Sequence, residues 1–336
     1  MLRGTSEALT ERHDLAMLDL DGVVYVDGEA VPRAAESISS AREAGMRVAF
    51  ITNNASRTPT TVAEHLCRLG VRADAADVVT SAQAAARVLV EELGEGARVV
   101  LLGAEGLDEA VRAVGLEPVG VEDDAAAVVT GYGPDVRWRE VMRAAVRIRD
   151  GLWWVASNTD LSIPTAYGTA PGHGVLVETL QRFSGVDPVV AGKPARPLLD
   201  ETVRRVGGQR PLMVGDRLDT DIEGAVATGV EALLVLTGVT DLAALLSARA
   251  QERPTYLHLD LRGLLEPHPE VVVDDTGATC GGWTARVDDG RLVVQGQGDE
   301  TDWWRAAAVA GWAHLDATGD VASTDDLVGP PTPVGR

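Results

Sequence analysis

Short apolar runs alternate with amphipathic stretches along most of the chain. The runs that predict buried strands are Leu15–Leu20, Val48–Ile51, Val99–Leu102, Ala126–Val129, Trp153–Ala156, Val189–Ala191, Leu212–Val214 and Ala232–Leu236. The stretches that predict helices are Pro32–Ala44, Thr58–Leu69, Ala82–Leu93, Trp138–Arg149 and Pro197–Val206. Continuous apolar strands that alternate with helices are typical of a parallel sheet covered on both faces. The pattern therefore predicts an α/β fold class.

Polar residues follow four of the predicted strands. Parallel sheets bind ligands outside the carboxyl ends of their strands, so these residues are the first candidates for chemistry. They comprise four carboxylates, one ammonium and a hydroxyl and amide group, at Asp19, Asp21, Thr52, Asn53, Lys193, Asp216 and Asp221.

The spacing of these strand ends predicts an inserted domain. Thr52 and Lys193 are 141 positions apart, whereas one crossover with its helix needs only ~30 residues. We therefore expect a core domain over residues 1–81 and 188–262, interrupted by a cap domain over residues 82–187. Within the cap, the Pro-, Gly- and Thr-rich stretch Ser162–Gly174 predicts a polar loop.

The pattern changes again in the last quarter of the chain. Val271–Asp274 and Trp283–Val294 predict strands, the latter with a turn at Asp288–Gly290, and Thr301–Leu315 predicts a helix. These elements predict a small α+β appendage over residues 263–328. The remaining residues, 329–336, predict a disordered tail.

The composition limits the kinds of molecule that the protein is expected to bind. The net charge of −21 argues against nucleic acid or an anionic membrane as the main partner, because both are polyanions. No apolar run approaches the ~18 residues of a membrane helix, and the N-terminal residues lack the apolar segment of a secretory signal. The two cysteines form no CxxC pair. We expect a cytoplasmic protein that acts on a small molecule.

One residue stands out in the composition. The 30 basic residues are 29 arginines and a single lysine, Lys193. An ammonium is a compact charge with three donors, which a planar guanidinium cannot imitate in a tight site. Lys193 is therefore either an ammonium that such a site requires or a surface lysine that is present by chance.

The strand-end residues together predict phosphoryl chemistry. Carboxylates that converge repel each other and need a cation, and an all-oxygen ligand set suits Mg²⁺. Lys193 and Thr52 would supply donors to an anion, so that metal and donors could bind a phosphoryl group. Any single aspartate is better explained as a helix cap; the four strand ends together favour the functional interpretation.

The same residues carry a resemblance. The motifs DLDGVVY (19–25), ITNN (51–54), GKP (192–194) and GDRLDTDIEGA (215–225) resemble the four motifs of the haloacid dehalogenase-like (HAD) phosphatases, subclass IIA. The likeness covers about residues 14–245 and implies a HAD Rossmann-like core with an α/β cap of the C2 type. Lys193 falls on the lysine of the third motif.

The resemblance implies a two-step hydrolysis of a phosphomonoester. Asp19 would be the nucleophile that forms an aspartyl-phosphate, and Asp21 the general acid and base. Mg²⁺ would be held by Asp19, the backbone carbonyl of Asp21 and Asp216, with support from Asp221. The phosphoryl group would be bound by Thr52, Asn53 and Lys193.

The cap is expected to select the substrate. Its candidate contact residues are Asn158, Asp160 and His173, although asparagine, aspartate and glycine-rich loops also have ordinary turn roles. Overall the chain resembles bacterial glycerol-3-phosphate phosphatases with an acetyltransferase-like C-terminal extension. The appendage lacks a Q/R-x-x-G-x-G/A motif, so we expect it to pack, dimerise or regulate rather than transfer acetyl groups.

Several alternatives remain open at the level of sequence. The first is a broad phosphatase acting on nitrophenyl phosphate, nucleotides, phosphoglycolate or pyridoxal phosphate. A phosphomutase or dehalogenase is less favoured, because dehalogenases lack the residue equivalent to Asp21. The last is a non-catalytic sensor of phosphate esters. A homodimer through the cap or the appendage is also expected as a candidate assembly.

Overall fold

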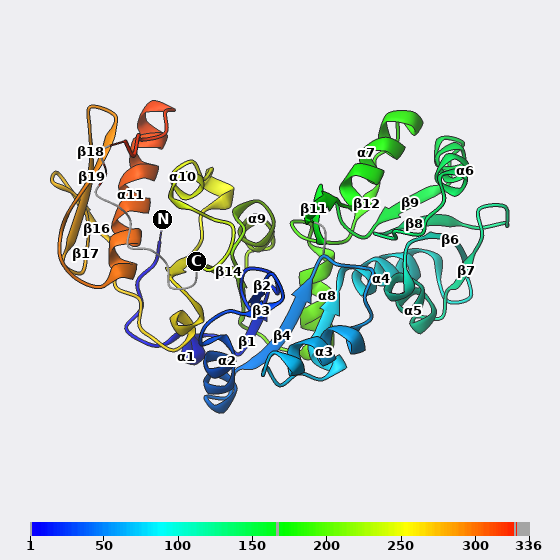
Figure 1. The fold of residues 1–336 in the computed structure, drawn as a ribbon, viewed down its shortest axis with the longest axis horizontal. Helices are drawn as coiled ribbons and strands as arrows, with labels where there is room; N and C mark the ends of the chain where they lie inside the picture. The colour runs from blue at the N-terminus through cyan, green and yellow to red at the C-terminus, as the bar shows by residue number, and fades with distance from the viewer. Residues whose placement is uncertain (1, 166–167, 326, 328–336) are drawn as a thin grey trace. The chain divides into compact units, whose positions relative to one another are not determined.

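The computed structural model describes residues 2–165, 168–325 and 327. The chain divides into two compact units (Figure 1). Unit 1 comprises Met1–Val48, Leu69–Val71 and Gly208–Arg336, and unit 2 comprises Ala49–Arg68 and Arg72–Gly207. The predicted disordered tail, residues 329–336, lies outside the described residues.

Unit 1 contains four adjacent parallel strands in the order β15-β14-β13-β1. Their bounds are Tyr256–His258, Glu231–Val235, Pro211–Gly215 and Leu15–Leu18. All four side chains of β1 are buried, as expected for a strand with covered faces. The other elements here are α1 (Leu9–Arg12), β2 (Tyr25–Val26), β3 (Glu29–Ala30), α2 (Ala34–Glu43), η2 (Leu218–Ile222), α9 (Glu223–Thr228), α10 (Leu242–Leu246), η3 (Ala250–Glu252) and η4 (Leu261–Leu264).

The register of β1 and β13 aligns their carboxyl ends. Leu15 is opposite Pro211 and Leu18 is opposite Val214. The residues that follow, Asp19 and Asp216, therefore leave the sheet at the same edge. This placement is what the apolar pattern predicts.

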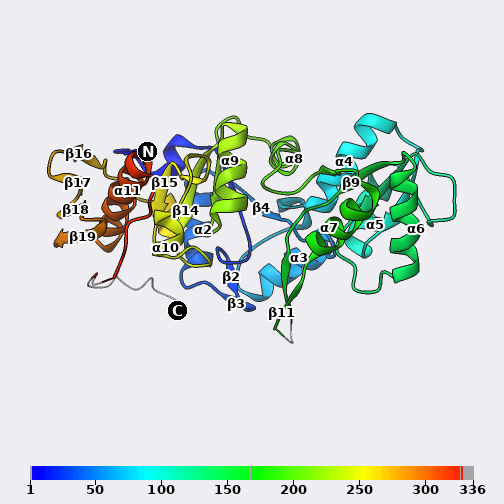
Figure 2. The same ribbon diagram turned by 90° about the horizontal axis from the view of Figure 1, so that it is seen from above.

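The C-terminal part of unit 1 is an antiparallel sheet with one long helix. The strands β16 (Val272–Asp274), β17 (Gly277–Cys280), β18 (Trp283–Asp288) and β19 (Arg291–Gly296) are adjacent in that order. The helix α11 (Glu300–Thr318) lies alongside this sheet (Figures 1 and 2). The predicted hairpin turn and helix are confirmed, whereas β17 carries too short an apolar signal to be expected.

A buried arginine ties α11 to the strands of unit 1. The guanidinium of Arg305 donates to the carbonyl of Leu257 at 3.1 Å, to Asp302 Oδ1 at 2.8 Å and to Nδ1 of His268 at 2.9 Å. Because Nδ1 of His268 accepts, its Nε2 carries the proton and donates to the carbonyl of Gly263 at 2.8 Å. Burial lowers the pKa of His268 to about 4, so this imidazole is neutral near pH 7.

Unit 2 contains a second parallel sheet, in the order β12-β9-β8-β6-β7. Its strands are Val189–Val190, Trp153–Ala156, Ala127–Thr130, Arg98–Leu102 and Glu117–Val119. Strands β4 (Arg47–Thr52) and β5 (Val78–Thr80) pair with each other in parallel. The remaining elements are α3 (Pro59–Arg68), η1 (Ala75–Asp77), α4 (Ser81–Leu93), α5 (Glu105–Ala113), α6 (Trp138–Arg149), β10 (Ser162–Thr165), β11 (Gly168–Pro171), α7 (His173–Ser184) and α8 (Pro197–Val206).

The core of unit 2 forms where its helices cover the second sheet. Helix α6 buries Val141, Ala144, Ala145 and Ile148 on one face, at the spacing of an amphipathic helix. These side chains pack in one cluster with Trp154 and the strand residues beside it. Trp154 Nε1 donates to Thr130 Oγ1 at 3.1 Å, which satisfies the polar atom of this buried ring.

Two expectations need correction. The stretch Ser162–Gly174, predicted as a polar loop, contains an antiparallel hairpin in which Ser162 is opposite Pro171, and His173 begins α7. Helices α5 and α7 are absent from the predicted elements. The α/β fold class with a C-terminal α+β part is confirmed. Within the described residues, we find no helix both long and apolar enough to span a membrane.

The buried histidine gives unit 1 a specific pH dependence. The unfolded chain binds a proton at His268 below about pH 6.5 and the folded chain only below about pH 4, so stability is lost as pH falls through this window. We expect the histidine to cost roughly 2 kcal/mol at pH 5 relative to pH 7.5. Urea unfolding at both pH values measures this, and the loss should be smaller in His268→Gln. A His314→Gln variant is the control, and an equal loss in all three proteins would contradict the assignment.

Candidate active site

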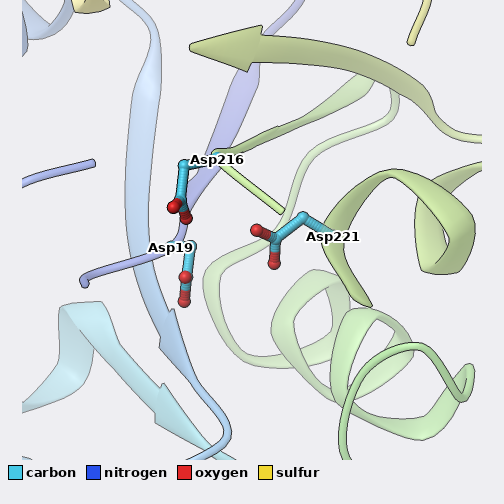
Figure 3. Close-up of side chains that lie close together, drawn as sticks. All are labelled: Asp19, Asp216 and Asp221. Carbon is cyan, nitrogen blue, oxygen red and sulfur yellow. The ribbon is translucent and has the colours of Figure 1, made fainter. Parts of the chain in front are cut away.

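Three carboxylates meet at the edge where β1 and β13 end. Asp19 follows β1, Asp216 follows β13, and Asp221 lies in the π-helical turn η2 (Figure 3). One carboxylate oxygen from each lies within 4.8 Å of the others. Asp216 and Asp221 are buried and Asp19 is half-buried. Two parallel strand ends and the turn η2 thus place three carboxylates in one small volume.

The carboxylate of Asp216 is held by two loops, one at Gly22 and one after strand β14. The backbone N–H of Val239 donates to Asp216 Oδ2 at 2.7 Å, and Thr240 Oγ1 donates to the backbone carbonyl of Asp216. A Cβ atom on Gly22 would lie 2.3 Å from Asp216 Oδ2, and one on Gly238 would lie 1.9 Å from it. Only glycine fits at both positions.

Asp221 is held by its own turn. The backbone N–H of Arg217 donates to Asp221 Oδ2 at 3.1 Å. The guanidinium of Arg217 donates instead to Asp219, through Nε at 3.0 Å and Nη2 at 2.8 Å. The guanidinium of Arg217, the cation in this turn, therefore pairs with the carboxylate of Asp219.

These carboxylates fit a divalent cation. Burying two carboxylates beside a third is costly unless a cation offsets their charge. All donors are hard oxygens, which suits Mg²⁺ better than the softer metals. The cluster includes Asp221, which the sequence assigns only a supporting place, and it includes no side-chain oxygen of Asp21.

Asp21 lies two residues beyond Asp19 and is exposed. The chain from Leu20 to Tyr25 forms a tight turn in which the N–H of Gly22 donates to the carbonyl of Tyr25 at 2.8 Å and the N–H of Val24 donates to the carbonyl of Leu20 at 2.9 Å. Gly22 has a φ of +82°, which favours glycine. The turn thus leaves Asp21 at an exposed position.

A second set of candidate residues is linked within unit 2. Thr52 ends β4, and Asn53 follows it. The backbone N–H of Lys193 donates to Asn53 Oδ1 at 2.8 Å, and Asn53 Nδ2 donates to the carbonyl of Lys193 at 3.0 Å. All three residues are buried, with Lys193 only 2% exposed. The lone lysine is therefore not a chance surface residue.

The three cap candidates join the same network. Asn53 Nδ2 donates to Asp160 Oδ1 at 3.1 Å, and Asn158 Nδ2 donates to the carbonyl of Asn53 at 2.7 Å. His173 Nδ1 donates to the carbonyl of Asn158 at 2.8 Å. Burial lowers the pKa of His173 to about 4. Asn158 and His173 are buried, whereas Asp160 is half-buried.

Sequence reasoning misses two parts of this arrangement. The segment Thr237–Thr240 frames Asp216 and follows the buried strand β14, so the rule used for the other strand ends would have found it. Ser81 Oγ donates to the carbonyl of Asn53 at 2.5 Å, and nothing in the local sequence marks it.

The chain is similar to known proteins. The model of the haloacid dehalogenase-like hydrolases matches residues 16–117, a HAD-hydrolase-like model matches residues 190–264, and a GCN5-related N-acetyltransferase-like model matches residues 280–330. The D-glycerol 3-phosphate phosphatase of Mycobacterium tuberculosis is 44% identical over 297 residues, which cover 88% of this chain and 82% of that protein. The 5'-nucleotidase YutF of Bacillus subtilis is 34% identical and covers 67% of this chain and 87% of its own length.

A solved structure extends the likeness to the fold. The glycerol phosphate phosphatase of Mycobacterium tuberculosis, crystallised with calcium, superposes with a TM-score of 0.83 at 42% identity and covers 97% of this chain and 93% of its own. Its magnesium complex gives the same TM-score and identity, with coverages of 91% and 92%.

The α/β fold and the carboxylate cluster at its strand ends define a Mg²⁺-dependent phosphoric monoester hydrolase. The chain belongs to the haloacid dehalogenase-like hydrolases.

The carboxylate cluster predicts that Mg²⁺ stabilises the fold. A ligand that binds only the folded state raises stability by RT ln(1 + [L]/Kd), about 2.7 kcal/mol at 100 times Kd. We expect Mg²⁺ to raise the thermal midpoint of the wild type and EDTA to reverse the rise.

Asp216→Asn should abolish this Mg²⁺-dependent shift, because it removes one buried charge from the cluster. The matched control is Asp219→Asn in the same loop, since Asp219 is exposed and pairs with Arg217. A normal shift in Asp216→Asn, or a lost shift in Asp219→Asn, would show that the ion binds elsewhere.

Proposed function

We propose that this enzyme hydrolyses glycerol 3-phosphate to glycerol and phosphate. The observation that supports this most strongly is the likeness over nearly the whole chain, C-terminal part included, to the glycerol phosphate phosphatase of Mycobacterium tuberculosis. The 44% identity spans 82% of that phosphatase. Likeness over the phosphatase core alone would support only the class of phosphoric monoester hydrolases and no particular substrate.

We propose Asp19 as the nucleophile. Its carboxylate would attack phosphorus while the ester bond breaks, and Asp21 would donate a proton to the leaving alkoxide. In the second step Asp21 would accept a proton from water, the water oxygen would attack phosphorus, and Asp19 would be released with its carboxylate intact. The exposure of Asp21 suits a group that changes protonation twice per turnover.

We propose that Mg²⁺ is held by Asp19, Asp216, Asp221 and the backbone carbonyl of Asp21. The bound ion supplies charge neutralisation for the nucleophile and the phosphoryl group. Asp216 and Asp221 contribute buried, fixed oxygens, so the cluster needs little reorganisation when the substrate arrives.

Thr52, Asn53 and Lys193 are proposed as the residues that secure the phosphoryl group. The single ammonium of the chain provides the charge, and Thr52 provides a hydroxyl. Asn158, Asp160 and His173 remain the proposed determinants of substrate choice. Of these, Asp160 is the one whose side chain is partly exposed, so Asn158 and His173 would act through the backbone that they hold.

Two further properties stay proposals. A cytoplasmic location accords with Cys67 and Cys280, which are both free thiols. A homodimer through the cap accords with Trp138 and Met142, which are 64% and 56% exposed on one face of α6.

Phosphate release from a panel of esters tests the substrate. We expect Mg²⁺-dependent turnover with the highest kcat/KM for glycerol 3-phosphate, and no turnover by Asp19→Asn. The panel includes nitrophenyl phosphate, a 5'-nucleotide, phosphoglycolate and pyridoxal phosphate. A flat profile would replace the proposal with a broad phosphatase. A preference for the nucleotide would favour the activity named for the Bacillus subtilis relative.

A further inference from the structure

The carboxamide of Asn53 is fully committed before any substrate arrives. A primary amide offers two N–H donors and one carbonyl oxygen. Its two donors go to the carbonyl of Lys193 at 3.0 Å and to Asp160 Oδ1 at 3.1 Å. Its oxygen accepts from the N–H of Lys193 at 2.8 Å. The oxygens of a phosphoryl group accept hydrogen bonds, so this side chain has no donor left for them.

The pairing fixes the backbone of Lys193 at two points. Asn53 bonds both the N–H and the carbonyl of the same residue, as a neighbouring strand would in a sheet. The approach is so close that a Cβ atom on Gly192 would lie 2.6 Å from Asn53 Oδ1. Because the backbone of Lys193 is held, its side chain starts from a fixed position.

Asn53 is in turn held from the cap segment. Asn158 Nδ2 and Ser81 Oγ both donate to the backbone carbonyl of Asn53, at 2.7 and 2.5 Å. Asn158 Oδ1 accepts from the N–H of Asp160 at 3.1 Å, which places Asp160 to receive the second donor of Asn53. Every one of these links lies within unit 2.

We propose that Asn53 is a positioning residue whose carboxamide aims Lys193 at the phosphoryl group and does not itself bind phosphate. Asp160 and Asn158 complete this role by fixing Asn53. The inference rests on the proposed function, in which Lys193 binds the phosphoryl group. It narrows the part of Asn53 in that site and gives Asp160 a partner other than substrate.

A double-mutant cycle tests whether Asn53 acts through Lys193. A misplaced catalytic group can cost about 100-fold in rate, so we expect Asn53→Ala to lower kcat/KM for nitrophenyl phosphate by about that factor. In a Lys193→Arg background, where the ammonium is already lost, the same change should cost less than about threefold. If the two losses in kcat/KM instead multiply in the double variant, the proposal is wrong.

An exchange of partners provides a second test that keeps the shape of the site. Asn53→Asp replaces the donating Nδ2 by an oxygen that faces two acceptors, and activity should fall. Asp160→Asn added to that variant removes the contact between two carboxylates and returns a donor between residues 53 and 160, while the N–H of Lys193 keeps its acceptor at residue 53 and the carbonyl of Lys193 stays without its donor. We therefore expect a partial recovery of kcat/KM, by about tenfold. If the carboxamide of Asn53 bound phosphate, the exchange would restore nothing, because position 53 would still lack its donor.

Controls separate this inference from loss of folding and from the proposed function. Asp187→Asn, in an exposed cap carboxylate that accepts from Gln181, should rescue nothing when added to Asn53→Asp. The Mg²⁺-induced rise in thermal midpoint should persist in every variant, since the carboxylates lie in unit 1. A wild type that hydrolyses no ester would refute the function itself, whereas an active wild type with multiplying costs refutes only the role of Asn53.

Discussion

Repulsion among Asp19, Asp216 and Asp221 is the constraint on which the site depends. Their oxygens lie within 4.8 Å of one another, and two of the carboxylates are buried. The register of β1 against β13 and the turn η2 create this crowding, and the backbone donors around it hold it in place. A divalent cation turns that unfavourable arrangement into a preorganised site for an anionic ester.

The residues proposed to bind the phosphoryl group are held in place by hydrogen bonds rather than by charge crowding. Lys193 is buried and is the single lysine of the chain. A flexible four-carbon stem loses much rotamer entropy when its ammonium is held in one place. Because Asn53 fixes the backbone of Lys193, less conformational entropy remains to be lost when its ammonium is held in place. In the proposed role of Asn53, the residues that hold it, Asn158 and Asp160, affect the chemistry without a need to touch the reacting atoms.

The sequence predicts the strands, their polar ends and hence Asp19, Asp216, Lys193 and the α/β class, because a buried parallel strand leaves a strong local signal. It does not predict the hairpin β10–β11, whose Thr- and Gly-rich strands lack that signal. The strand-end rule could have marked the segment after β14, but it does not reveal that Val239 and Gly238 contact Asp216, since only the tertiary fold brings these loops together. Likewise, only the folded structure reveals that Asn53 shares its hydrogen bonds between Lys193 and Asp160.

The most direct test of the account is to find the phosphoryl group on Asp19. The Asp21→Asn variant lacks the base for the second step, whereas nitrophenolate is a leaving group that needs little help from an acid. Acid quenching after mixing this variant with nitrophenyl phosphate and Mg²⁺, followed by peptide mass spectrometry, should place a phosphoryl group on the peptide that contains Asp19. The Asp19→Asn,Asp21→Asn double variant should carry none. Release of nitrophenolate by Asp21→Asn with no phosphorylated peptide would contradict nucleophilic attack by Asp19.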